Sequence, residues 1–291
     1  YALTENGAVI TDYFWDEVVP AEIVVPETLG GQPVIGVAGF AFARPIPDVQ
    51  WPPEGACIRL PEGMQFLESG AFYSCRNVRE VQLPASLERI DENAFWYLGG
   101  DIVVAQGNPH FTCEDGFLID QRTSTLLYVA PSGQNNPLPA VKRLGDICLY
   151  NYNVMEPVLP DTLTAIGCSV FNDWAYVTHI DIPAGVTEIG VAAFNCAGLT
   201  EITLPAGLTA IEDLAFSCNY FTEITIPEGV TLIESWAFYM CPLKRVEIPA
   251  SCTFVAADAF DPEVELVLLG DNTHVETERE LDARERGAEH V

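Results

Sequence analysis

The side chains of this chain that can do chemistry are 42 carboxylates, nine cysteines and four histidines. Two carboxyl groups about 5 to 9 Å apart can hydrolyse a glycosidic bond, but among 42 of them such a pair arises by chance. The sequence contains no G-x-S-x-G, no H-E-x-x-H, no phosphate-binding glycine loop and no C-x-x-C pair of zinc ligands. We therefore predict a protein that is not an enzyme and that has no metal and no cofactor. A glycan hydrolase with paired carboxylates stays as an alternative.

The composition excludes several other classes of protein. The formal charge is −29 and the pI is near 4.1, so the chain repels phosphate backbones and anionic membranes. No apolar stretch reaches the roughly 18 residues of a membrane-spanning helix, and Tyr1–Asp12 lacks the basic and apolar segments of a signal peptide. The sequence thus predicts neither a nucleic-acid partner nor membrane insertion, and it is typical of a mature or trimmed form from which a signal peptide is absent.

These side chains must be positioned by an internal repeat. The pair Ala193-Phe194 is repeated every 22 or 23 residues along most of the chain, and a proline precedes most copies of the Phe by eleven residues. The other copies of this Ala-Phe slot are Ala41-Phe42, Ala71-Phe72, Ala94-Phe95, Cys148-Leu149, Val170-Phe171, Ala215-Phe216, Ala237-Phe238 and Ala259-Phe260. A fixed period of this length indicates a stack of similar coils.

The segment before each proline alternates between apolar and polar residues. Leu199–Leu204 and Phe221–Ile226 show this period of two, which predicts a strand with one buried face. A proline ends ladder pairing, and Pro-x-Gly, as in Pro205-Ala206-Gly207, fits a turn. We therefore predict a repeat solenoid: a right-handed, β-rich superhelix of parallel strands like that of leucine-rich repeats, with about 22 to 23 residues per coil.

The repeat also predicts how the chain is divided. Residues 1–270 form one solenoid, in which 1–43 is an N-terminal capping coil and 101–138 is a strand plus a β-hairpin insertion. The hairpin strands are expected at Gly116–Asp120 and Thr125–Val129, and Arg44–Ala56 at a proline-rich surface loop. Residues 271–291 are predicted to be a charged tail or linker, in which pairs such as Glu280 and Arg284 favour a helix.

The repeat unit reads L-x-x-I-x-[IL]-P-x-x-[VL]-T-x-I-x-x-x-A-F-x-x-C, and Leu199 to Cys218 shows it almost entire. This unit resembles the BspA-like leucine-rich repeat. The resemblance covers about residues 1 to 269, and it implies a secreted or surface-attached bacterial protein that is adhesive toward host extracellular components and not catalytic. The chain departs from ordinary leucine-rich repeats because proline stands where those proteins carry an asparagine ladder.

The alternation that buries Ile202 and Leu204 exposes polar residues on the opposite face of each strand. The candidate ligand-binding residues on this predicted sheet face are Glu80, Gln82, His179, Asp181, Glu201, Thr203, Glu223, Thr225, Arg245 and Glu247. Such an acidic ribbon suits a basic partner segment or a divalent cation. The competing interpretation is a solvated face whose charges aid solubility.

Aromatic and sulfur side chains give further candidates. Trp51 in the proline-rich loop is a candidate exposed anchor for a partner. Aromatic residues that follow the Ala-Phe slot suit stacking on sugars or packing between coils; they are Tyr73, Trp96, Tyr150 and Tyr239. Cysteines that follow the slot are predicted to stack as small buried hydrophobes, with a metal or redox column as the alternative; they are Cys75, Cys196, Cys218 and Cys241.

Together these observations favour an interaction module at the cell surface or outside the cell. We expect a monomer that binds an extracellular protein, including basic segments, or a glycan through the acidic sheet face. A structural spacer that displays another domain is the alternative from a different class, and the charged segment at the C-terminus motivates it.

Overall fold

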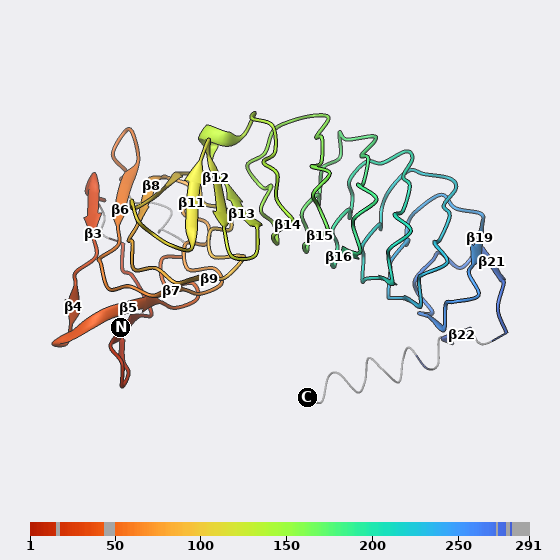
Figure 1. Cartoon of the computed structure of the whole chain (residues 1–291), viewed down its shortest axis with the longest axis horizontal. Coiled ribbons are helices and arrows are strands. Elements are labelled where there is room, and N and C mark those ends of the chain that lie inside the picture. The colour runs from red at the N-terminus through yellow and green to blue at the C-terminus, as the bar shows by residue number, and fades with distance from the viewer. Residues whose placement is uncertain (16–17, 44–49, 272, 278–279, 281–291) are drawn as a thin grey trace. The chain divides into compact units, whose positions relative to one another are not determined.

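The computed structural model describes the chain except residues 16–17, 44–49, 272, 278–279 and 281–291. Successive coils stack into a parallel β solenoid of about 12 turns with almost no helix, which confirms the predicted fold class (Figure 1). The coils fall into two compact units. Unit 1 comprises Tyr1–Asn136 and Gly145–Asn153, and unit 2 comprises Pro137–Leu144 and Val154–Val291.

Unit 1 contains fourteen of the described elements. They are β1 (Ala2–Leu3), β2 (Ala8–Ile10), β3 (Glu22–Val24), β4 (Thr28–Leu29), β5 (Gln32–Val37), β6 (Ala56–Arg59), β7 (Phe66–Leu67), β8 (Val78–Leu83), β9 (Arg89–Ile90), β10 (Asp101–Val104), β11 (Phe111–Glu114), β12 (Phe117–Asp120), β13 (Thr125–Val129) and the 3-10 helix η1 (Pro131–Gly133). One parallel sheet has the order β10-β8-β6-β3, and a second sheet has the order β1-β2-β5-β7-β9 with β4 beside β5.

Unit 2 is built from shorter strands. They are β14 (Arg143–Leu144), β15 (Ala165–Ile166), β16 (Glu188–Ile189), β17 (Ala210–Ile211), β18 (Leu232–Ile233), β19 (Arg245–Ile248), β20 (Phe254–Val255), β21 (Glu265–Leu268) and β22 (His274–Val275). One parallel ladder joins β14, β15 and β16 in that order, and another joins β17, β18, β20 and β22 in that order. A separate pair, β19 and β21, is parallel over four residues. The ladder thus reaches Val275, inside the segment predicted to be a tail.

Stacked phenylalanines from the Ala-Phe slot fill the interior of each unit. In unit 2 the rings of Phe194, Phe216 and Phe238 follow one another at 5.5 and 5.6 Å with interplanar angles of 6° and 10°. In unit 1 Phe42 and Phe72 stack at 5.1 Å. All five rings are buried. A single coil has no way to cover both of its apolar edges. Burial of such side chains between neighbouring coils is therefore the main contribution to the stability of the fold.

The backbone turns sharply on both sides of each stacked ring. Ala192 and Cys196 flank Phe194 with φ of 54° each, and Leu214 and Cys218 flank Phe216 with φ of 58° and 56°. A residue other than glycine in this left-handed region is strained by roughly 1 to 2 kcal/mol. The conformation persists because it aligns hydrogen bonds between coils, such as Phe194 N–H to the Ala215 carbonyl at 2.8 Å.

The predicted strands at 199–204 and 221–226 are not formed. Coils of unit 2 are joined instead at the Ala-Phe slot and at the two-residue strands, where Thr187 N–H and Thr231 N–H donate to the Thr164 and Thr209 carbonyls. These hydrogen bonds already join neighbouring coils. The alternating segments therefore do not form ladders along their whole length. The prediction of which residues are buried there was better: Leu204 and Ile226 are buried, and Glu201 is exposed.

The predicted hairpin is present in unit 1. Strands β12 and β13 pair antiparallel, and β11, which the sequence did not indicate, pairs with β12 to make a three-stranded meander.

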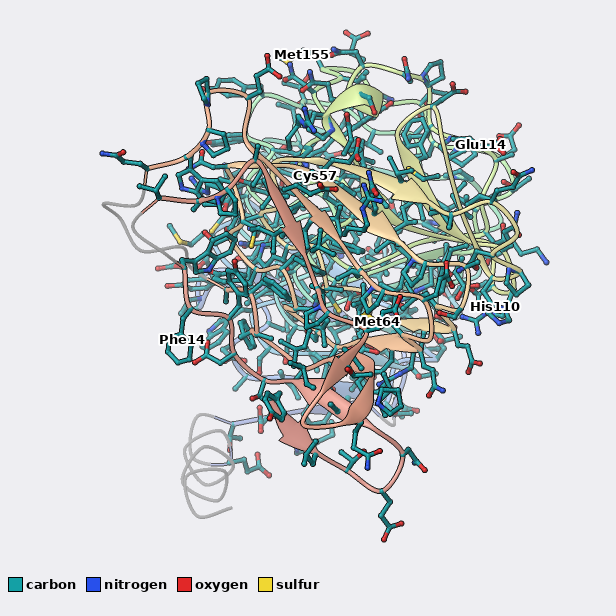
Figure 2. All side chains as sticks on the ribbon, turned by 90° about the vertical axis from the view of Figure 1, so that its left-hand side faces the viewer. Phe14, Cys57, Met64, His110, Glu114 and Met155 are labelled. Carbon is teal, nitrogen blue, oxygen red and sulfur yellow. The ribbon has the colours of Figure 1, made fainter. Side chains whose placement is uncertain are left out.

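Phe14, near the N-terminus of unit 1, is an apolar side chain that points away from the protein, with 84% of its surface exposed (Figure 2). Residues 44–49 of the Arg44–Ala56 loop and most of the predicted helix of the tail lie outside the described residues.

Candidate functional site

The acidic face of unit 2 is made of the alternating segments 178–182, 200–204 and 222–226 together with β19. On it, the imidazole of His179 lies between two carboxylates, with Nε2 3.0 Å from Asp181 Oδ1 and Nδ1 3.3 Å from Glu201 Oε1. Asp181 belongs to the same coil as His179, and Glu201 to the next. The side chain of Asp181 is 97% exposed. The structure thus brings three of the predicted residues together at the surface.

The other predicted residues of unit 2 continue this face. Thr203, Glu223 and Thr225 are exposed on the unpaired segments. In β19, Arg245 Nη1 lies 3.0 Å from Glu247 Oε1, and both side chains are about half exposed. Exposed ion pairs of this kind contribute little to stability. The side chains of the acidic face are therefore free to exchange these contacts for those of a partner.

Two hollows open where the segments do not pair. The first has a volume of about 640 Å³, and the acidic side chains Glu156, Asp161 and Asp181 line it. Its apolar lining includes Val158 and Tyr176, each 82% exposed. Met155, which is labelled in Figure 2, also lines this hollow and is 59% exposed. We call this hollow the acidic groove, since it combines apolar side chains with carboxylates.

Sequence reasoning missed the apolar part of the acidic groove. The coil from Phe171 to Phe194 has 23 residues instead of the 22 of the coils that follow. Val177 takes the buried position in this coil, and the additional length leaves Tyr176 outside. The longer spacing was the available signal, because an added residue must displace a side chain from a packed interior.

The second hollow, of about 860 Å³, has a mixed charge. Glu223, Glu228 and Glu247 line it together with Lys244 and Arg245. The cationic side chains of this hollow compensate its carboxylates, whereas among the described residues His179 is the only basic one that lines the acidic groove. The negative potential is therefore less compensated in the acidic groove.

Glu80 and Gln82 have different surroundings, because they belong to β8 in unit 1. This strand pairs with β6 on one side and with β10 on the other over four residues each. Glu80 Oε1 accepts hydrogen bonds from Gln82 Nε2 at 2.6 Å and from the thiol of Cys57 at 3.5 Å. Both side chains are half-buried. They lie on an interior strand that is paired on both sides, and not beside a hollow between unpaired segments.

Trp51 is half-buried and not a freely exposed anchor. Its ring lies 5.1 Å from that of the buried Trp15 and packs on the core of unit 1. The exposed part of Trp51 lines a hollow of about 500 Å³ together with Arg76 and Arg79. Most of the Trp51 side chain thus packs on the core, and this packing attaches the proline-rich loop to unit 1.

A strip of aromatic rings follows the Ala-Phe slots of unit 1. Tyr73 lies 5.1 Å from Trp96 and 5.7 Å from Tyr97, and Tyr97 lies 4.4 Å from Tyr150. Arg76 extends the strip, since its guanidinium lies 5.3 Å from the centre of the Tyr97 ring. The predicted edge of aromatic residues is therefore continuous in unit 1. Tyr239 belongs to unit 2, where it is exposed.

The cysteines do not form the single column that was predicted. Cys75 and Cys241 are buried, and their thiols donate to the Phe42 and Phe216 carbonyls at 3.1 and 3.2 Å. Burial raises the pKa of the Cys241 thiol to about 12. Cys196 and Cys218 occupy the position one residue earlier in the coil and are only half-buried. The packing role thus holds for the first pair alone.

Within the described part of the chain, no three His, Cys, Asp or Glu side chains are grouped so as to hold a metal ion. The divalent-cation interpretation of the acidic face therefore has no converging ligands in those residues. A search of the same residues for a helix long and apolar enough to cross a membrane finds none.

Two solved structures of other proteins are similar to this chain. The chain is similar to a leucine-rich repeat protein from Eubacterium ventriosum, with 16% identity and a TM-score of 0.54 over 88% of this chain and 77% of that one. It is also similar to the pneumococcal vaccine antigen PcpA, with 16% identity and a TM-score of 0.44 over 90% of this chain and 92% of that one. The comparison with curated proteins gives no match.

The family model for the BspA type leucine-rich repeat region matches in six copies, over residues 56–100 and 142–266. These residues include the coils that carry Phe72, Phe95 and the stacked rings of unit 2. The match covers more than half of the chain. The chain therefore belongs to the BspA type leucine-rich repeat family.

Proposed function

We propose that this protein is a non-enzymatic adhesion module, located at the cell surface or outside the cell, that binds an extended basic segment of a partner protein along the acidic face of unit 2. Membership of the leucine-rich repeat family supports an interaction module in general. The observation that carries the proposal is the acidic groove, where Asp181 and Glu156 stand beside the exposed Tyr176 and Val158.

The chemistry of the groove selects this class of partner. Lys and Arg side chains of a ligand meet carboxylates, and their aliphatic stems or neighbouring apolar residues cover Tyr176 and Val158. The backbone of the alternating segments is extended and unpaired over most of its length, so an extended ligand gains main-chain hydrogen bonds as well. The net charge of −29 accelerates encounter with a cationic partner, and salt weakens it.

Binding of the purified chain to a panel of extracellular matrix proteins and mucin glycans, at low and at physiological salt, tests the proposal. A triple variant with Asp181→Asn, Glu201→Gln and Glu223→Gln removes charge from the acidic face. A matched variant with Glu5→Gln, Asp12→Asn and Glu27→Gln removes the same charge from exposed positions of unit 1. We expect salt-sensitive binding that the first variant loses and the second retains.

Three results contradict the proposal. Equal losses in the two triple variants mean that only net charge matters. Binding that both variants retain places the contact elsewhere on the chain. The absence of binding to every member of the panel favours the spacer function, in which the solenoid displays another domain.

The aromatic strip of unit 1 supports a second candidate function, glycan binding. Tyr73, Trp96, Tyr97 and Tyr150 form one continuous edge, and ring faces of this kind stack on the apolar faces of sugars. Replacing Tyr97 and Tyr150 by Ala is expected to abolish binding to mucin glycans and to leave binding to basic proteins intact. Glycan binding unchanged in this variant contradicts the second function without affecting the first.

A further inference from the structure

Three sulfur atoms occupy equivalent positions in three successive coils of unit 2. Cys196, Cys218 and Met240 are each 22 residues apart, and their φ angles are 54°, 56° and 57°. Each lies two residues after the stacked Phe of its coil. None is buried, and Met240 is 60% exposed. We call this set the sulfur column; it contains Met240 where the sequence pattern suggested Cys241.

Two sulfur atoms of the column are in contact. Cys218 Sγ lies 3.8 Å from Met240 Sδ. Burial raises the pKa of the Cys196 thiol to about 11, and the neighbouring Cys218 acts in the same direction. The backbone fixes the spacing, because Cys196 N–H donates to the Ser217 carbonyl at 2.9 Å and Cys218 N–H donates to the Tyr239 carbonyl at 2.8 Å.

The distance between Cys218 Sγ and Met240 Sδ suits a bridging cation. Two metal–sulfur bonds of about 2.3 Å span the 3.8 Å between Cys218 Sγ and Met240 Sδ at an angle of roughly 110°. The thioether of Met240, in addition, has no means of forming a disulfide.

The ligand set identifies the class of cation. Thiolate and thioether ligands are soft and select copper(I) among the biological metals. Zinc prefers four ligands with nitrogen or thiolate donors, and the described residues contain no group of three or more His, Cys, Asp or Glu side chains that could hold a metal ion. Each thiol that binds the cation releases its proton to the buffer.

We propose that Cys196, Cys218 and Met240 form a surface site for a soft monovalent cation of the copper(I) class. The site is independent of the acidic face. It uses side chains that neither the Phe stack nor the hydrogen bonds between coils require.

Copper(I) titration of the reduced full chain, without oxygen and in competition with the chromophoric chelator bicinchoninate, tests this site. We expect one copper(I) per chain to resist the competitor. Cys196→Ser and Cys218→Ser should each weaken binding at least tenfold, and Met240→Leu, which keeps the shape of the side chain, should weaken it about tenfold. Cys113→Ser and Cys168→Ser are the matched controls, since both residues are half-buried cysteines outside the column.

The same titration can overturn the proposal. If Cys113→Ser or Cys168→Ser lowers the retention of copper(I) as much as Cys218→Ser does, the metal is bound by other thiols. Unchanged copper(I) affinity in Met240→Leu, with its thermal melt also unchanged, removes Met240 from the site and contradicts the proposed ligand set. Equal retention of zinc against a matched chelator contradicts the soft character of the site.

Discussion

The two units use the same repeat but differ at the sheet face. In unit 1, β6, β8 and β10 pair in parallel over four residues, and Glu80 and Gln82 bond to each other. In unit 2, the equivalent described segments 200–204 and 222–226 form no strand ladder, although Thr200 N–H donates to the Thr178 carbonyl, and the acidic groove and a second hollow open beside them. The Phe stack is alike in both units. This difference indicates that the stacked interior holds the coils together, so that strand pairing on the sheet face is not required and differs between the units.

The largest effects should come from the stacked rings, which the two units share. Phe216→Ala removes a buried ring between Phe194 and Phe238, and Phe72→Ala does the same between Phe42 and Phe95. We expect each change to lower the free energy of unfolding by about 3 to 5 kcal/mol, as measured by chemical denaturation. Phe14→Ala, at an exposed position, is the control and should change it by less than about 0.5 kcal/mol. A small effect of Phe72→Ala alone would show that closed ladders, and not the stack, stabilise unit 1.

A buried asparagine gives the next largest effect. Asn219 Nδ2 donates to the carbonyls of Phe194 and Phe216 at 2.8 Å, and its Oδ1 accepts from Leu199 N–H at 3.0 Å. Asn219→Ala leaves the Phe194 carbonyl and the Leu199 N–H unpaired, while the Phe216 carbonyl keeps the Cys241 thiol; we expect this to lower the free energy of unfolding by about 1 to 3 kcal/mol. The half-buried Asn151 of unit 1 makes similar bonds, and Asn151→Ala should cost less because water replaces its contacts. The reverse order would contradict the hydrogen-bonding account.

Backbone strain differs from coil to coil on a smaller scale. One coil of unit 1 has Gly70, with φ of 72°, at the position where another coil of unit 1 has Phe40 and the coils of unit 2 have Ala192, Leu214 and Trp236, all with positive φ. Ala192→Gly should therefore raise the melting temperature, by relief of roughly 1 kcal/mol. Gly70→Ala should lower it, because a Cβ there would lie 2.8 Å from the Phe40 ring. Ala193→Gly is the control; Ala193 is buried outside the left-handed region, and a gain in stability there would refute the strain argument.

The smallest expected effect is a pH dependence that arises from Asp120 in the hairpin of unit 1. Burial of Asp120 in the hairpin raises its pKa, but hydrogen bonds from Arg122 outweigh burial, so the net shift is downward. The carboxylate therefore stabilises the fold above its unfolded pKa, near 3.8, and this contribution is lost as the pH falls through the lower folded value. The stability difference between the wild type and Asp120→Asn should be present at pH 7 and vanish in strong acid. A difference that is constant over this range would refute the role of the charge.

The sequence predicts the repeat and its interior well, because the Ala-Phe slot recurs with a fixed phase and leaves one position for Phe194 and Phe216 to occupy. It does not predict whether the face pairs, since Leu199–Leu204 and Val78–Leu83 have the same alternation but only the second is a strand. Pairing depends on how neighbouring coils approach each other, which the alternation within one segment does not specify. The acidic side chains were therefore found, whereas the groove and the exposed Tyr176 were not.

The two sheet faces can be compared directly by amide hydrogen exchange of the full chain at single-residue resolution. The account predicts strong protection in β6 and β8 and fast exchange at Ile202–Leu204 and Ile224–Ile226, since only the first set is bonded to neighbouring strands. Equal protection of the two sets would show that the face of unit 2 is closed, and would contradict both the open groove and the binding proposed for it.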